Sequence, residues 1–234
     1  MPSSAGEPVT HAVAAVVVAA GSGSRLGASV PKALVPVAGE PLVAHAVRRL
    51  LQGGVDVVVV VAPSAHLEAV KDAVGGQVAV VVGGASRQAS VAAGLAAVPA
   101  TADVVLVHDA ARCFAPPELV ARVVAAVRSG HRAVIPVGPV ADTLVTASED
   151  APVARYEDRS RMRTVQTPQG FDRATLDRAH AAGVHRAAAE SLAATDDASL
   201  VAALGEQVWA VAGDDAAMKI TTPRDLALAE GLNR

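Results

Sequence analysis

Short runs of consecutive apolar residues recur along the first 137 residues of the chain. The first, residues 13–20, is nearly unbroken, and Val-rich runs follow at residues 55–62, 77–82, 102–108 and 131–137. Runs of this length, without alternating polar positions, are typical of strands that are buried on both faces of a parallel sheet. The pattern therefore predicts a series of parallel strands in the interior of the protein.

Helical patterns occupy the gaps between these runs. Apolar residues recur at helical spacing in residues 41–52, 66–74, 87–98 and 116–129. Strands that alternate with helices in this way predict βαβ units. We therefore expect an α/β fold with a Rossmann-like, mostly parallel twisted sheet that is flanked by helices.

The alternation stops after Val137. Residues 138–169 are more polar, contain most of the clustered arginines, and include only two β-like triplets, at residues 143–145 and 164–166. A segment with so few apolar residues has little hydrophobic surface with which to cover a face of its own. We interpret it as a β-arm that projects from the sheet and is stabilised against a second subunit, which predicts a homodimer.

Regular patterning returns in the C-terminal part. Residues 173–182 and 196–204 have helical patterns, and residues 207–211 read as a strand. Thr222 is a candidate N-cap for a last helix, with Pro223 in its first turn. We expect a flexible tail, residues 1–12, followed by a single domain, residues 13–234, that includes the arm.

Composition narrows the class of protein. Hydrophobic residues make up 52% of the 234 residues and aromatic residues 2%, which indicates one large domain with an aliphatic core. The 20 basic residues are spread along a chain of net charge −3, so nothing indicates a nucleic-acid partner. No signal-peptide pattern or membrane-length apolar run is present, and the single cysteine, Cys113, suits a reducing compartment. These features predict a cytoplasmic protein that binds no membrane.

A glycine-rich turn follows the first apolar run. Residues 21–24 read GSGS, Arg25 comes next, and Lys32 lies seven residues after it. Glycines let a backbone approach a ligand and point its N–H groups at an anion, so two cations beside them indicate a phosphate site. A dinucleotide site needs G-x-G-x-x-G and an acid after the second strand, and a P-loop needs G-K-[ST]; neither is present. A tight turn with two solvated cations is the simpler alternative.

Asp109 follows the run at residues 102–108, where open α/β sheets place their ligand sites. One carboxylate beside a nucleotide's phosphates suits Mg²⁺, which takes few protein carboxylates and completes its coordination with phosphate and water. The alternative is an N-cap for the next helix. We expect the neighbouring His108 to be structural.

Three further residues could belong to the same site. Gly84 and Ser90 follow the run at residues 77–82 and suit either the wall of a base or ribose pocket or an ordinary loop and helix start. Lys219 precedes the last helix. A lone lysine there is usually solvated, but with Arg25 and Lys32 it could form a three-cation clamp around a triphosphate.

In their order along the chain, these segments resemble one family, the 2-C-methyl-D-erythritol 4-phosphate cytidylyltransferases of the non-mevalonate isoprenoid pathway. The resemblance extends over residues 14–230 and rests on AAGSGSRLG…PK, GGASRQASVAAGL, VHDAAR, ADT, VQTPQGF, TDDASL and KITTP. The first motif occurs in sugar-phosphate nucleotidyltransferases generally. VHDAAR together with TPQGF and TDDAS is much more specific.

The resemblance implies a role for individual residues. CTP would be contacted by the backbone of Ala19, Ala20 and Gly21, its phosphates would be bound by Arg25 and Lys32, and its cytosine pocket would be lined by Gly84 and Ser90. Asp109 would hold Mg²⁺, and Lys219 would contact phosphates and organise Asp109. Methylerythritol phosphate would be received by Arg112, Thr143, Arg159, Thr167 and Thr195. Members of the family pass the arm to a second subunit. Thr143 and Arg159 would then serve the neighbour's site.

The implied reaction transfers CMP from CTP to methylerythritol phosphate by in-line attack on the α-phosphate, with Mg²⁺ or another divalent ion. The chain departs from the family pattern at Cys113, where proline is common, at Val145, which replaces a lysine of the arm, and at Ala217, where asparagine is frequent. Two other hypotheses are a cytidylyltransferase for a polyol phosphate such as ribitol 5-phosphate and a nucleotide-binding regulator without catalysis.

Overall fold

The computed structural model describes residues 11–21, 26 and 30–232. Its strands are β1 (Ala12–Val18), β2 (Pro36–Val37), β3 (Glu40–Pro41), β4 (Val57–Ala62), β5 (Ala79–Val82), β6 (Ala102–Asp109), β7 (Ala133–Pro139), β8 (Val145–Thr146), β9 (Arg155–Tyr156), β10 (Arg163–Val165), β11 (Gln169–Asp172) and β12 (Val208–Ala212). Its α-helices are α1 (Leu42–Gln52), α2 (Leu67–Val74), α3 (Arg87–Ala97), α4 (Pro117–Arg128), α5 (Arg173–Ala182), α6 (Asp197–Ala203) and α7 (Pro223–Leu232). Outside the arm, the elements that the hydrophobic pattern predicts lie within two residues of their expected bounds.

The main sheet has the strand order β10-β7-β11-β6-β1-β4-β5, and β12 pairs with β7. β1 lies between β4 and β6 and is parallel to both, and β5 is parallel to β4. Only β10 and β11 run antiparallel to their neighbours among the described strands of this sheet. Because the central strands are parallel, their C-terminal ends meet at one edge, where Val18 lies beside both Val61 and Asp109.

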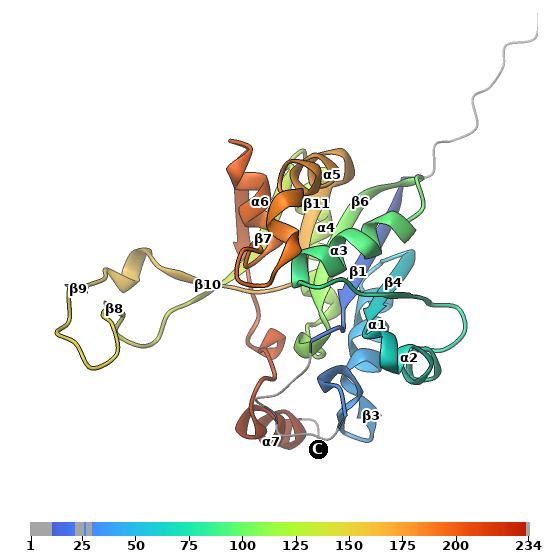
Figure 1. Ribbon diagram of the computed structural model, residues 1–234, viewed down its shortest axis with the longest axis horizontal. Helices are drawn as coiled ribbons and strands as arrows, with labels where there is room; N and C mark the ends of the chain where they lie inside the picture. The colour runs from blue at the N-terminus through green and yellow to red at the C-terminus, as the bar shows by residue number, and fades with distance from the viewer. Residues whose placement is uncertain (1–10, 22–25, 27–29, 233–234) are drawn as a thin grey trace, which may run out of the picture.

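Helices cover both faces of the sheet (Figure 1). In β1, Val13, Ala15 and Val17 pack in the same cluster as α1 and α4, whereas Ala14 and Val16 pack with α3, α5 and α6. Successive side chains of a strand point to opposite faces, so a strand covered on both sides is apolar at every position. The structure thus confirms an α/β fold with a mostly parallel sheet between helical layers.

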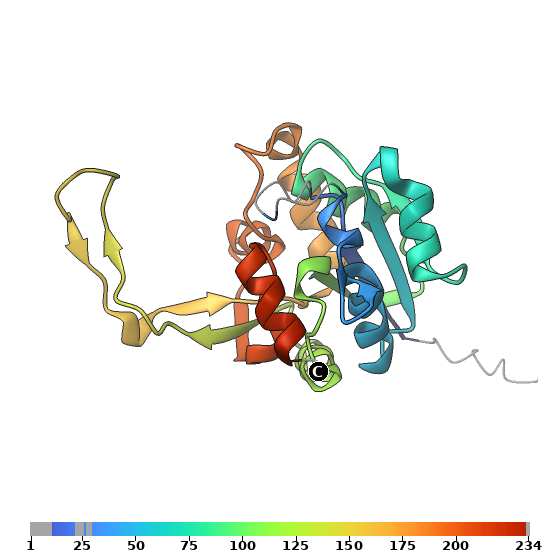
Figure 2. The ribbon, with the colours of Figure 1, turned by 90° about the horizontal axis from the view of Figure 1, so that it is seen from below.

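A β-arm projects from the body between β7 and β10 (Figures 1 and 2). β8 and β9 pair antiparallel toward its tip, and β7 and β10 pair antiparallel at its base. Every residue from 139 to 165 is described, and none of them is buried. Residues 139–165 of the predicted arm thus bury no face of their own, and contact of the arm with a second subunit stays a prediction.

The arm ends before residue 169, the predicted limit. Gln166 and Thr167 are buried in the body, and β11 then lies antiparallel between β6 and β7. The sequence of β11, QGFD, has Phe171 as its one large apolar residue, so its pattern predicts no strand. At the other end of the chain, Ala12 belongs to the predicted tail but is the first residue of β1 and pairs with Ala102. Residues 1–10 of the predicted tail lie outside the described residues.

Among the described residues, no helix has both the length and the apolar character needed to cross a membrane.

Candidate active site

A pocket of about 500 Å³ opens at the C-terminal edge of the parallel strands. Its walls come from the end of β1, the loop before α3, the end of β6 and the segment before α7. The lining residues are Val18, Ala19, Ala20, Gly21, Lys32, Ala33, Gly84, Ala85, Ser86, Arg87, Ser90, Asp109, Ala110, Ala111, Glu190, Lys219 and Thr221. These segments are far apart in the sequence, and the parallel topology brings them to one place, as is general for ligand sites of open α/β sheets.

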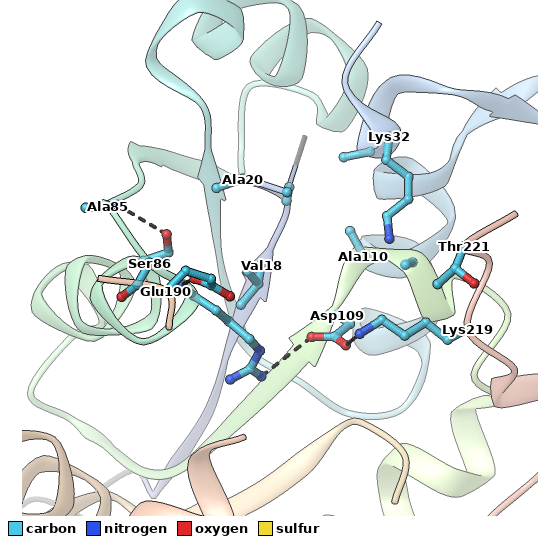
Figure 3. Close-up of a pocket in the computed structure, with 17 residues that line it drawn as sticks. Val18, Ala20, Lys32, Ala85, Ser86, Asp109, Ala110, Glu190, Lys219 and Thr221 are labelled. Atoms are coloured by element: carbon cyan, nitrogen blue, oxygen red, sulfur yellow. Dashed lines mark hydrogen bonds and ion pairs between the residues drawn. The ribbon is translucent and has the colours of Figure 1, made fainter. Parts of the chain in front are cut away.

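Asp109, the last residue of β6, lies in this pocket between two cations (Figure 3). Lys219 Nζ is 2.7 Å from Asp109 Oδ2, and Arg87 Nη2 is 3.5 Å from Asp109 Oδ1. Burial alone would raise the pKa of Asp109, but the positive charges of Arg87 and Lys219 outweigh burial and hold this pKa well below its ordinary value. Asp109 is therefore ionised at neutral pH.

The N-cap alternative for Asp109 is wrong. Asp109 stands at the N-cap position of the short 3-10 helix η4 (Ala110–Arg112), but its side chain accepts no capping hydrogen bond. Its backbone N–H instead donates to Thr167 Oγ1, at an N–O distance of 3.0 Å. Its carboxylate thus faces the pocket and the two cations.

Lys219 is presented to Asp109 by a segment that is held on two sides. The Ile220 N–H donates to the carbonyl oxygen of Ala111, at 2.8 Å. Asp225 Oδ2 accepts from the N–H and the hydroxyl of Thr221 and from the N–H of Thr222, at 2.8–2.9 Å. These bonds, led by that from the Thr221 N–H, lower the pKa of Asp225 to about 2. Asp225 thereby fixes the turn that carries Lys219.

Lys32 begins the 3-10 helix η2 (Lys32–Leu34) and lines the pocket. Figure 3 shows its side chain pointing toward Ala110. Ala19 follows β1 and donates its N–H to the carbonyl oxygen of Val61 in β4, at 2.9 Å. The chain is therefore still hydrogen-bonded to β4 at the point where it begins to line the pocket. Ala20 and Gly21, which are predicted to contact CTP, also line the pocket, and Arg25 lies outside the described residues.

The loop before α3 is both a pocket wall and an ordinary helix start. Ser90 Oγ accepts a hydrogen bond from the Gly84 N–H, at 3.2 Å, and Ser86 caps the helix by accepting from the Ala89 N–H, at 3.1 Å. A Cβ atom at Gly84 would lie 2.5 Å from the Cβ of Ala89. The loop can therefore close on the first turn of α3 only with glycine at this position.

The residues predicted for the acceptor substrate do not line this pocket. Arg112 donates to the carbonyl oxygens of Ala217, at 2.7 Å, and Val165, at 3.0 Å, and so joins the base of the arm to the segment before Lys219. Thr195 is exposed just before α6.

Thr143 and Arg159 lie on the arm, where both are exposed. Arg159 donates to the carbonyl oxygen of Ala141 and lines a second cavity, of about 670 Å³, at the base of the arm. Within one chain these residues are not brought to Asp109.

His108 and Thr167 form a buried pair beneath Asp109. Thr167 Oγ1 is 3.0 Å from His108 Nδ1, and both side chains are buried. Burial lowers the pKa of His108 to about 4, so its imidazole is neutral at pH 7. The expectation that His108 is structural is supported, and the Thr167 hydroxyl, predicted for the acceptor, is already bonded to Asp109 and His108.

Arg87 is the main site residue that sequence reasoning missed. Its Nη1 is 2.7 Å from Asp197 Oδ2, and Asp197 Oδ1 is 2.9 Å from His180 Nε2. Burial would lower the pKa of Arg87, but the carboxylates of Asp197 and Asp109 raise it above its ordinary value. Arg87 stands in GGASRQ and Asp197 in TDDASL, but no spacing rule connects two motifs that lie this far apart.

Glu190 is a second lining residue that the sequence did not indicate. Its Oε2 accepts a hydrogen bond from the Arg87 backbone N–H, at 2.8 Å. Glu190 thus joins the segment before α6 to the first turn of α3.

The described residues contain no group of three or more His, Cys, Asp or Glu side chains that could bind a metal ion. Asp109 offers one ionised carboxylate that faces a pocket. This donor set does not suit a structural zinc ion, which needs four protein ligands. It fits Mg²⁺, which is commonly held by one or two carboxylates together with a nucleotide's phosphates.

Known proteins resemble the chain over nearly its whole length. Residues 13–234 match the family model described as IspD, 2-C-methyl-D-erythritol 4-phosphate cytidylyltransferase. The protein of that name from Rhodococcus opacus (strain B4) is 51% identical over 221 residues, which cover 94% of each chain. The one from Saccharopolyspora erythraea is 51% identical over 227 residues, 94% of this chain and 98% of that one.

A solved structure gives the same result. The crystal structure of 2-C-methyl-D-erythritol 4-phosphate cytidylyltransferase from Thermus thermophilus superposes with a TM-score of 0.77 at 41% identity. It covers 93% of this chain, and this chain covers 97% of it. Family model, sequence relatives and fold all agree: the chain belongs to the 2-C-methyl-D-erythritol 4-phosphate cytidylyltransferases, a family of nucleotidyltransferases.

Proposed function

We propose that this protein transfers CMP from CTP to 2-C-methyl-D-erythritol 4-phosphate, which gives 4-diphosphocytidyl-2-C-methyl-D-erythritol and pyrophosphate for isoprenoid precursor synthesis. The observation that carries the proposal is the pair Asp109–Lys219. It places an ionised carboxylate and a cation 2.7 Å apart at the ligand edge of the sheet. The names of the relatives supply the two substrates.

The reaction needs positioning and charge stabilisation from the protein. A phosphate oxygen of the acceptor forms a bond to the α-phosphorus of CTP, and the bond from that phosphorus to the β-phosphate oxygen breaks, which releases pyrophosphate. The attacking oxygen is already anionic, so no side chain has to act as a nucleophile. Groups that hold the two substrates in line and stabilise the charge on the α-phosphate and the leaving group therefore carry the catalysis.

Cations at the pocket provide that charge. Lys32 and Lys219 line it, and Arg25 follows the glycine turn in sequence. We assign them to the triphosphate, with Lys219 also orienting Asp109. Asp109 would hold Mg²⁺ together with the nucleotide's phosphates, and the ion, when bound, would neutralise phosphate charge and polarise the α-phosphate.

The opposite wall suits the cytidine. Ala19, Ala20 and Gly21 present backbone groups, and Gly84 lets its loop lie close to α3. The Ser90 hydroxyl accepts from the Gly84 N–H and keeps its own proton for donation to a ligand. Short, rigidly held polar groups on this wall could recognise a cytosine ring.

We propose that the acceptor site is completed by a second subunit in a homodimer. Thr143 and Arg159 project on an arm that buries no residue against its own body. Arg112 and Thr195 lie outside the described pocket. They belong to the body of the chain and would bind the acceptor from there, opposite the partner's arm. An arm inserted into the partner's site would bring a guanidinium group to the acceptor phosphate, for which arginine is well suited.

The proposal is tested by pyrophosphate release from CTP with Mg²⁺ and a panel of acceptors. We expect release with 2-C-methyl-D-erythritol 4-phosphate and none with EDTA. Release with ribitol 5-phosphate in its place would identify a polyol-phosphate cytidylyltransferase. No release with any acceptor, from a protein that still binds CTP, would indicate a regulator without catalysis.

A further inference from the structure

Arg87 bridges two carboxylates that come from different parts of the fold. Its Nη1 lies 2.7 Å from Asp197 Oδ2, and its Nη2 lies 3.5 Å from Asp109 Oδ1. Each of these nitrogens therefore faces a different acid. The planar guanidinium fork can hold this arrangement, whereas the single ammonium of lysine cannot reach both acids in the same way.

The anchor of this bridge is rigid. The Asp197 side chain is 1% exposed, and its second oxygen is 2.9 Å from Nε2 of the buried His180. A carboxylate buried this deeply is costly unless it stays paired, so Asp197 holds Arg87 in place. The Arg87 backbone N–H is fixed as well, because it donates to Glu190.

The other end of the bridge is the carboxylate that our proposal assigns to the divalent cation. Lys219 fixes Asp109 Oδ2, and Arg87 lies against Oδ1, so the two cations constrain the carboxylate from opposite sides. The Lys219 side chain is 42% exposed, whereas that of Arg87 is 17% exposed. Arg87 is thus the more buried of the two partners.

We propose that Arg87 is a positioning residue that acts through Asp109: anchored by Asp197, it fixes the orientation in which the Asp109 carboxylate binds a divalent cation with the nucleotide's phosphates. This inference rests on the proposed function. Groups that orient a metal ligand in this way typically change metal affinity or activity about 10- to 100-fold when they are replaced. Arg87→Lys keeps the charge and removes the bridge, so it separates orientation from electrostatics.

The test measures binding of Mn²⁺ to the full-length protein with CTP and without acceptor, so that no turnover occurs. Water-proton relaxation distinguishes Mn²⁺ on the protein from Mn²⁺ on free CTP. We expect Arg87→Lys to weaken Mn²⁺ binding about tenfold. Because Arg87 also lines the pocket, CTP binding in EDTA is measured for the same variant, and we expect it to weaken less than Mn²⁺ binding does. Asp197→Asn, which loosens the anchor outside the pocket, should weaken Mn²⁺ binding in the same direction. Arg173→Lys is the matched control, because Arg173 pairs with Asp177 on the surface of α5 and should leave Mn²⁺ binding unchanged.

A double variant tests whether Arg87 affects Mn²⁺ binding through Asp109. If Arg87 acts through Asp109, Arg87→Lys should cause no further loss of Mn²⁺ binding in the Asp109→Asn protein, whereas an additional loss would overturn the inference. Wild-type Mn²⁺ affinity in Arg87→Lys would also overturn the inference. If Arg87→Lys fails to fold, wild-type Mn²⁺ affinity in Asp197→Asn would overturn the inference instead. Failure of the proposed function itself is seen separately, as absent CMP transfer by the wild-type protein.

Discussion

Lys219 Nζ lies 2.7 Å from Asp109 Oδ2, although the two residues come from the segment before α7 and the end of β6. The Ile220 N–H donates to the carbonyl oxygen of Ala111 and so ties the segment that carries Lys219 to the residues that follow Asp109. Asp109 is ionised and accepts a short contact from Lys219, so we assign the pair to orienting and stabilising charge in the pocket.

The first prediction concerns the two pocket lysines. Lys219→Met and Lys32→Ala should each lower kcat about 100-fold, the scale of one lost transition-state contact. The midpoint of thermal unfolding should change little in Lys219→Met, because Asp109 remains beside Arg87. Lys71→Met, which removes a surface lysine paired with Glu68, is the control and should keep wild-type kcat. Near-normal turnover in both pocket variants would contradict the assignment of these cations to the triphosphate.

The second prediction concerns the support beneath Asp109. Thr167→Val keeps the shape of the side chain but leaves the Asp109 N–H and His108 without the hydroxyl. An unsatisfied buried polar group costs about 1–3 kcal/mol, so we expect urea-induced unfolding to show a loss of this size together with lower kcat. Thr167→Ser restores the hydroxyl and should recover most of both. If the valine variant were as stable as wild type, the hydrogen bonds of the Thr167 hydroxyl would not contribute to the stability of the fold.

Much of this arrangement follows from sequence, but not all of it. The strand ends that carry Gly21, Gly84 and Asp109 follow from apolar runs, because a parallel sheet places those ends at one edge. The bridge from Arg87 to Asp197 does not follow, since it depends on how the fold places the first residue of α6 beside the first residue of α3. β11 was also missed, because its neighbours in the sheet and not its own residues make it a strand.

The third prediction is a pH dependence of stability. The folded-state pKa of Asp225, about 2, is below its ordinary value of 3.8, so its hydrogen bonds to Thr221 and Thr222 stabilise the fold above the unfolded pKa. This stabilisation is lost as pH falls from about 4 toward 2. Asp225→Asn should therefore unfold at a lower temperature than wild type at pH 7, and the difference should shrink below pH 4. Replacing the exposed Asp72 should give no such difference; a gap between wild type and Asp225→Asn that widened in acid would rule out this role.

The fourth prediction concerns the arm. Pro139 and Arg163 are partners in the β7–β10 ladder, so an Asn-Gly turn can replace residues 140–162 without changing the register. We expect this variant to keep the thermal unfolding of the body and to elute as a monomer. A dimer of unchanged mass after this deletion would show that the arm does not hold the subunits together.

Mixing two inactive variants tests whether the arm serves the neighbour's site. One protein carries Asp109→Asn and an intact arm, and the other carries Arg159→Ala and an intact pocket. After subunit exchange, half of the dimers combine one of each, and each of these has one complete site, so about a quarter of wild-type activity should return. No recovery would place Arg159 in the site of its own subunit.

The central claim is that the pocket at Asp109 transfers CMP. Its most direct test is a single-turnover measurement with CTP labelled at the α-phosphate, excess protein and 2-C-methyl-D-erythritol 4-phosphate. We predict that the label moves from CTP to the acceptor with the wild-type protein and that Asp109→Asn slows this transfer about 100-fold or more while the protein remains folded. Transfer of the label at the wild-type rate by Asp109→Asn would contradict the claim.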